Sequence, residues 1–139
     1  MKLTALISVC LLVSLFSCKY EDGPSFSLRS KKARVVNAWF IDRVYENGVD
    51  KTEDYKTAFV NYQFQIKKDD NFILTYRPYN VGNYEQKGTW KFSDDKANFV
   101  FTPEGTSDQN TWKIMRLKHN EFWVTANLNN KDVELHLKD

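Results

Sequence analysis

The strand pattern of this chain is clearest at residues 58–67, which read AFVNYQFQIK. Every second side chain from Ala58 to Ile66 is apolar or aromatic, and those between them from Asn61 to Lys67 are polar. Successive side chains of a β-strand point to opposite faces. The alternation therefore predicts a strand with one buried side and one side in water.

The same alternation recurs further along the chain. It is clear at residues 84–92 and 133–138. Turn-forming pairs such as Asn47-Gly48 separate neighbouring segments, and Asn, Asp and Gly tolerate the positive φ that tight hairpins require. We expect less regular strands in five further ranges: 34–45, 71–79, 97–103, 110–118 and 121–128.

Eight consecutive strands with short connections predict an all-β fold. The economical topology is an eight-stranded antiparallel up-and-down barrel across residues 33–139, because closing the sheet removes its exposed edges. In the first strand, Trp39 and Ile41 occupy one face, while Val36 and Phe40 occupy the other. We expect a strand that is apolar on both faces to bend and to pair with two neighbours where the barrel closes.

The composition fits a single folded domain. The chain has 139 residues, a length sufficient for one hydrophobic core. Of these residues 15% are aromatic and 27% are charged, a composition that argues against wholesale disorder. The charges nearly balance, with 20 Lys+Arg against 18 Asp+Glu. A nucleic-acid partner is not expected, because the basic excess typical of such proteins is missing.

The first residues are typical of a secretory signal. Lys2 supplies a positive start, and residues 3–16 form an apolar run without charge or Pro. A transmembrane helix needs about 20 apolar residues, and this run is shorter. The alternative, a buried N-terminal helix, would need a polar face that the run does not have. We therefore expect residues 1–17 to be a signal peptide.

The end of this signal, Leu15-Phe16-Ser17-Cys18, resembles the bacterial lipobox. The resemblance implies that Cys18 becomes the first mature residue and carries a diacylglycerol and an acyl chain such as palmitate, which together anchor a protein stably to a membrane. Phe16 is bulkier than the residue usual at its position. The alternative is an ordinary secreted protein cut near Ser17. Cys10 would leave with the signal, so the mature chain would have no disulfide of its own.

Residues 18–32 are expected to be the lipidated Cys and a flexible tether. They combine charges with Gly23 and Pro24 and show neither helical nor strand periodicity. Residues 20–22 (YED) look like the acidic stretch that exports some Bacteroidetes-type lipoproteins to the cell surface. A merely hydrophilic tether is equally open, so we expect an outer-membrane lipoprotein that faces either the periplasm or the surface.

Short motifs in a fixed order carry a family resemblance. They are Val35-x-x-x-Trp39, Tyr45-Glu46-Asn47-Gly48, Phe64 followed by Asp69-Asp70-Asn71-Phe72, Gly88-Thr89-Trp90, and Trp112-x-Ile114-x-x-Leu117. Together they resemble the short lipocalin-like lipoprotein domains of Bacteroidetes over about residues 34–138. In that family a Gly usually stands two residues before the first Trp, where this chain has Asn37. The resemblance implies an eight-stranded barrel, a lipid anchor and no established reaction.

The sequence offers little catalytic or metal-binding chemistry. Outside the signal, the chain has only His119, in an expected turn, and His136, on the polar face of the last strand, and we expect both to be solvated. No spacing brings together the three or four ligands of a zinc site. We therefore expect no enzyme, no metal and no cofactor.

The inner face predicted by the alternation is rich in aromatic side chains. Such rings can fill much of an eight-stranded barrel unaided. Some inner-face residues are polar, and buried polar groups need partners, which a ligand or trapped water can supply at an open end. The candidate ligand-binding residues are Tyr62, Tyr76, Tyr84, Gln86, Trp90 and Trp112.

Two functions remain open. The first is binding of a small apolar or amphipathic molecule, which requires a lumen of a few hundred cubic ångströms. The second is an interaction module, in which a filled barrel binds another envelope protein as an inhibitor or accessory subunit. An exposed aromatic patch would favour the second. Its expected members are Phe40, Phe59, Tyr79 and Trp123.

Overall fold

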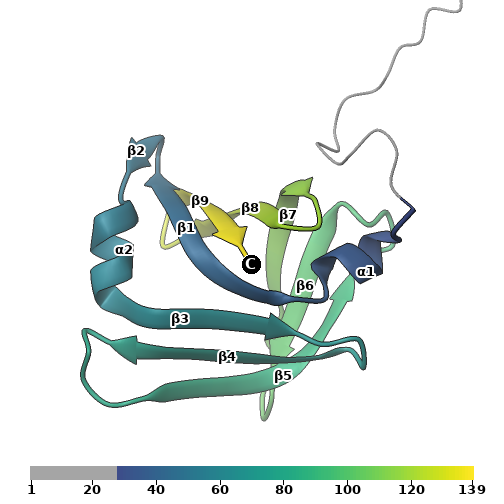
Figure 1. Ribbon diagram of the computed structural model, residues 1–139, viewed down its shortest axis with the longest axis horizontal. Helices are drawn as coiled ribbons and strands as arrows, with labels where there is room; N and C mark the ends of the chain where they lie inside the picture. The colour runs from purple at the N-terminus through teal and green to yellow at the C-terminus, as the bar shows by residue number, and fades with distance from the viewer. Residues whose placement is uncertain (1–27) are drawn as a thin grey trace, which may run out of the picture.

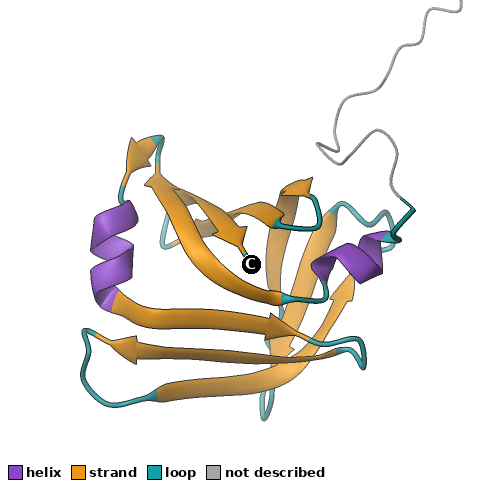
Figure 2. Ribbon diagram, viewed as in Figure 1, coloured by secondary structure: helices purple, strands orange, loops and turns teal. Residues whose placement is uncertain are grey.

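The computed structural model describes residues 28–139, so the predicted signal, Cys18 and most of the tether lie outside the described residues. The strands are β1 Ala38–Glu46, β2 Val49–Asp50, β3 Phe59–Ile66, β4 Asn71–Pro78, β5 Tyr84–Phe92, β6 Asn98–Pro103, β7 Asn110–Leu117, β8 Glu121–Leu128 and β9 Lys131–Lys138. From β3 to β9 each strand pairs antiparallel with the next, and β1 pairs with both β3 and β9 to close the barrel (Figures 1 and 2). The predicted fold, an eight-stranded antiparallel barrel, is confirmed.

None of the helices in this part of the chain is both long and apolar enough to cross a bilayer.

Strands β3 to β9 begin and end within two residues of the predicted ranges, whereas the first strand does not. Helix α1, Lys31–Val35, occupies the start of the predicted range 34–45, so the strand prediction is wrong over residues 34–37. The side chain of Ser30 begins the helix by accepting a hydrogen bond from the backbone N–H of Ala33 at 3.1 Å. Val35 and Trp39 are four residues apart, a spacing that suits one helical turn as well as a strand face.

A second helix, α2 at Thr52–Ala58, was not predicted and lies between β1 and β3. These two strands pair only at Ala38–Gln65 and Trp39–Phe64, and beyond Trp39 they diverge. Helix α2 fills the space where they separate (Figure 1). As expected, β1 pairs with two neighbours at the closure, because its ladder with β9 runs from Phe40 to Glu46.

Strand β3 contains a β-bulge that alters the predicted alternation. Its ladder with β4 passes from Val60–Arg77 directly to Gln63–Thr75, and Asn61 has a φ of 55°. Two residues therefore oppose one on the neighbouring strand, which re-aims the preceding side chains. Phe59 consequently faces the inside of the barrel, and the prediction that it belongs to an exposed patch is wrong.

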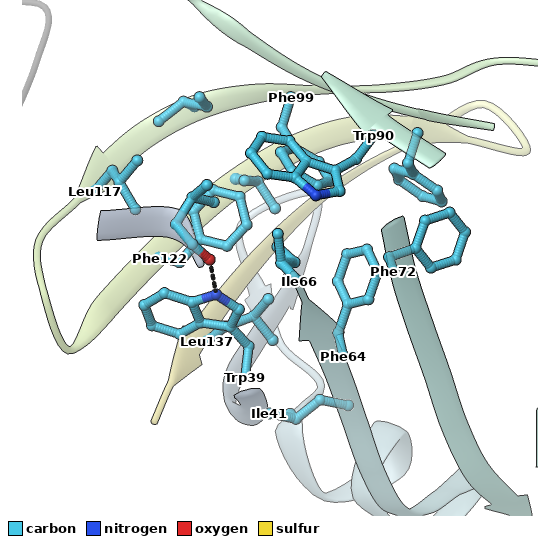
Figure 3. Packing of buried hydrophobic residues seen from close by; sticks show 14 of the residues in the cluster. Trp39, Ile41, Phe64, Ile66, Phe72, Trp90, Phe99, Leu117, Phe122 and Leu137 are labelled. Carbon is cyan, nitrogen blue, oxygen red and sulfur yellow. Dashed lines mark hydrogen bonds between the residues drawn. The ribbon is translucent and has the colours of Figure 1, made fainter. Parts of the chain in front are cut away.

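The hydrophobic core fills one end of the barrel (Figure 3). Trp39 is fully buried there and donates its indole N–H to the carbonyl of Val35 at 2.8 Å, which ties α1 across this end. Trp90 donates to the carbonyl of Lys67 at 2.8 Å and stacks on Phe99 with ring centroids 5.5 Å apart. Other large side chains packed at this end are Phe64, Phe72, Leu117 and Phe122.

Candidate ligand-binding cavity

The other end of the barrel is hollow. A cavity of about 360 Å³ lies among the inward side chains of all eight long strands and of α2. Tyr84 and Asn110 are the first residues of β5 and β7, and Leu128 is the last of β8, so the cavity lies at one set of strand ends. Helix α1 lies at the opposite set, where Lys32 pairs with Asp70 of the β3–β4 turn at 2.5 Å.

The structure brings most of the predicted site residues together around this cavity. The five that line it are Tyr62, Tyr76, Tyr84, Gln86 and Trp112. Trp90 does not line it, because Trp90 is 4% exposed and lies in the filled end. Its placement among the lumen residues was therefore wrong, since the alternation gives the face of a strand but not the depth along the barrel. That the other five contact a ligand stays a prediction.

The sequence interpretation missed several residues of the cavity wall. Tyr55 of α2 and Phe59 at the start of β3 stack with centroids 5.7 Å apart. Their spacing of four residues is the helical signal that could have revealed them. Asn110 also lines the cavity, and its separation of two residues from Trp112 on β7 could have placed it on the inner face.

One wall of the cavity is a continuous series of aromatic rings. Phe59 meets Tyr76 edge-on at 5.0 Å, and Tyr76 lies against Tyr84 at 4.6 Å. Together with the contact between Tyr55 and Phe59, these rings run from α2 across β3 and β4 to β5. Offset and edge-on ring contacts of this kind are favourable. They stabilise the packing of this wall.

The polar groups of the cavity wall are uncharged and largely unpaired. Within residues 28–139, the hydroxyls of Tyr62, Tyr76 and Tyr84 and the indole N–H of Trp112 make no hydrogen bond to another side chain or to the backbone. The indole N–H groups of Trp39 and Trp90 in the filled end, in contrast, both bond to backbone carbonyls. The open end therefore presents hydrogen-bonding groups to whatever occupies it.

Burial raises the pKa of three tyrosines of the cavity wall above the ordinary value of 10. It raises the pKa of Tyr62, with a smaller contribution from the neighbouring Tyr76, and it also raises the pKa of Tyr76. The pKa of Tyr55 is raised to about 12 by burial and by the hydrogen bond that its hydroxyl donates to Glu46 at 2.9 Å. These groups remain neutral hydrogen-bond donors at physiological pH.

No charged side chain of the described region lines the cavity. The carboxylate of Glu46 contacts the wall by accepting a hydrogen bond from the Tyr55 hydroxyl, and it also pairs with Lys131 at 3.2 Å. Likewise, residues 28–139 contain no group of three or more His, Cys, Asp or Glu placed to hold a metal ion. The arrangement is suited to binding an uncharged molecule, and the described residues that line the cavity include no acid–base pair.

The two histidines lie away from the cavity. His119 lies in an exposed bend, as predicted. His136 is 8% exposed on the outer face, so the prediction that it is solvated is wrong. Its ring stacks on Trp123 with centroids 3.9 Å apart, and its Nε2 is hydrogen-bonded to Glu134 at 2.6 Å. A cross-strand aromatic neighbour thus covers an outward-facing residue, which the alternation alone does not reveal.

Comparison with known proteins supports the fold. No protein-family model matches the chain, and no curated protein matches its sequence. A solved lipocalin-like protein from Bacteroides uniformis superimposes on 76% of this chain and 98% of its own, with a TM-score of 0.57 and 10% identity. The chain has a lipocalin-like fold. An uncharacterized protein from Bacteroides eggerthii matches over 75% of this chain and 98% of its own, with a TM-score of 0.54 and 11% identity.

At these identities the likeness concerns the fold alone. In this lipocalin-like barrel, one end is filled by aromatic side chains and bridged by α1, while the other end holds the cavity. The resemblance drawn from the sequence motifs is thus confirmed at the level of the fold.

Proposed function

We propose that this protein binds a small amphipathic molecule in the open end of its barrel, without catalysing a reaction on it. The observation that carries the proposal is the cavity of about 360 Å³, which lies within the range of small-molecule sites. Its walls combine aromatic and aliphatic surface with a few uncharged polar groups. That composition is typical of pockets that enclose and orient a ligand.

The alternative function, a filled barrel with an exposed aromatic patch, is less well supported. Of the four residues expected in that patch, Phe59 lines the cavity. Trp123 is covered on one side by the guanidinium of Arg116, 4.4 Å from its ring, and on the other by His136. Phe40 and Tyr79 remain exposed, and two separate side chains are ordinary for a soluble surface.

We further propose that the protein is anchored in the bacterial outer membrane through lipid on Cys18. The lipobox resemblance of residues 15–18 supports the anchor. Helix α1, the first described element after Cys18 in the sequence, lies at the filled end of the barrel, and the cavity opens at the other end. An anchor on Cys18 is therefore compatible with an open cavity. The Cys18→Ser variant should lose palmitate labelling and leave the membrane fraction. Continued fractionation with membranes would contradict the anchor.

Native mass spectrometry of the protein purified gently from its own host tests the binding function. We expect a reproducible bound mass in the wild type. Ala126→Phe places a ring in the cavity and should abolish that mass. Thr111→Phe places the same ring on the outer surface and should retain it. Clean ligand-free masses for all three proteins would overturn the proposal.

A further inference from the structure

We infer that the ligand of this cavity is uncharged and carries at least one hydrogen-bond-accepting oxygen, and that the cavity discriminates against carboxylates. The inference rests on the proposed binding function and specifies its ligand class. Three properties of the wall carry it: the charge of its side chains, the unpaired polar groups and the volume they enclose.

The charge of the wall argues against ionic ligands. An ion moved from water into a low-dielectric site needs a counter-charge or several hydrogen bonds to recover its hydration energy. The described wall residues include no Lys, Arg or His that could meet a carboxylate. Lys131 is exposed at the rim and already pairs with Glu46, whose own negative charge repels an anion. A fatty acid or another carboxylate would therefore lose hydration energy on entering the cavity that the described wall residues do not replace.

The polar groups of the wall argue for an oxygen-bearing ligand. The Trp112 indole can only donate a hydrogen bond, while tyrosine hydroxyls and the side-chain amides of Gln86 and Asn110 can donate or accept. A bare hydrocarbon would leave these groups without partners, and each loss is unfavourable. An organic cation could interact with the ring faces, yet a quaternary ammonium offers no acceptor to Trp112. A hydroxyl, carbonyl or ether oxygen meets this need.

The volume limits the size of the ligand. About 360 Å³ corresponds to the liquid volume of about twelve water molecules. A compound with two fused rings and one oxygen substituent fits within this volume. The ring series of Phe59, Tyr76 and Tyr84 offers such a compound edge and face contacts.

A series of naphthyl compounds that carry a neutral, an anionic or a cationic substituent tests the inference. The probes are 2-naphthol, 2-naphthoate and 2-naphthyltrimethylammonium, titrated into the full chain at pH 7 by calorimetry, with Ala126→Phe as the cavity-blocked reference. We expect 2-naphthol to bind at least tenfold more tightly than either ion. Equal or tighter binding of an ion overturns the inference but leaves the binding function standing. Binding of none of the three overturns both.

Isosteric variants test the role of the polar groups. Tyr62→Phe and Gln86→Leu should each weaken 2-naphthol binding by about three- to tenfold. Both should leave the melting temperature unchanged or raise it, because they remove cavity groups that have no partner among the described residues. The matched controls, Tyr79→Phe and Gln65→Leu, change exposed positions outside the cavity and should leave binding unchanged. Unchanged binding in both cavity variants contradicts the inference.

Discussion

At the scale of single residues, position along the barrel decides what a tryptophan does. Trp39 and Trp90 are buried in the filled end with their N–H groups bonded to carbonyls, and they stabilise the fold. Trp112 packs its ring against Phe101 at 4.8 Å but lines the cavity. Trp123 lies on the outer face between Arg116 and His136. The same residue type thus serves core, site and surface.

Trp90→Ala should lower the free energy of unfolding by about 3–5 kcal/mol, because it removes a large buried ring and leaves a cavity. Trp90 is 4% exposed and contacts Phe92 and Phe99. Urea denaturation measures the change. A wild-type midpoint would show that Trp90 does not belong to the core.

Gly88→Ala should destabilise the protein by about 1–3 kcal/mol through overpacking. A Cβ at this position would collide with the backbone oxygen of Thr102 and lie 2.6 Å from Cε1 of Phe72, whose ring covers the glycine. Thr89→Ala, on the exposed side of the same strand, is the control and should stay within about 0.5 kcal/mol of wild type. Equal stability of the two variants would argue against the close packing at Gly88.

At the scale of elements, the bulge in β3 and helix α2 create the side of the cavity that the sequence interpretation missed. Alternation predicted the strands and five of the residues that line the cavity, because side-chain direction in a strand has a period of two. It could not predict Phe59, since one extra residue at Asn61 breaks that period. Helix α2 was not predicted because it spans only seven residues, too few for a clear amphipathic pattern. The depth of Trp90 depends on strand tilt and register, which involve partners distant in sequence.

The left-handed backbone at Asn61 gives a test of the bulge. Asn61→Gly should be tolerated within a few tenths of a kcal/mol, roughly, because Gly adopts positive φ freely. Asn61→Val should cost about 1–2 kcal/mol, because β-branched residues are strained at a φ of 55°. Gln65→Val, at an exposed position of the same strand, controls for the change of side chain. Denaturant midpoints measure all three, and a neutral Asn61→Val would contradict the bulge.

At the scale of the whole molecule, the barrel divides into a filled end that supplies stability and an open end that holds the cavity. The buried tyrosines of the open end make the stability of the barrel depend on pH in the alkaline range. Their pKa values in the folded protein lie above the ordinary value of 10. Folding therefore favours the protonated hydroxyl, and this contribution is complete below about pH 10 and is lost as the pH rises further.

We accordingly expect the free energy of unfolding of the wild type to fall between about pH 10 and pH 12. Tyr55→Phe should flatten this decline, since the pKa of Tyr55 is raised to about 12. The matched control is Tyr79→Phe, which removes the hydroxyl of a tyrosine that is 70% exposed. Urea unfolding across this pH range measures both. Identical slopes for the two variants would contradict the role of Tyr55.

Two-dimensional NMR of the indole N–H groups during titration with 2-naphthol tests directly whether the ligand site lies in the open end of the barrel. The chain has four tryptophans. Trp39 and Trp90 report the filled end, Trp112 the cavity and Trp123 the outer face. We expect the Trp112 resonance to shift with ligand concentration, while those of Trp39 and Trp90 stay in place. A static Trp112 resonance, or shifts spread over Trp39 and Trp90 as well, would contradict a ligand site confined to the open end.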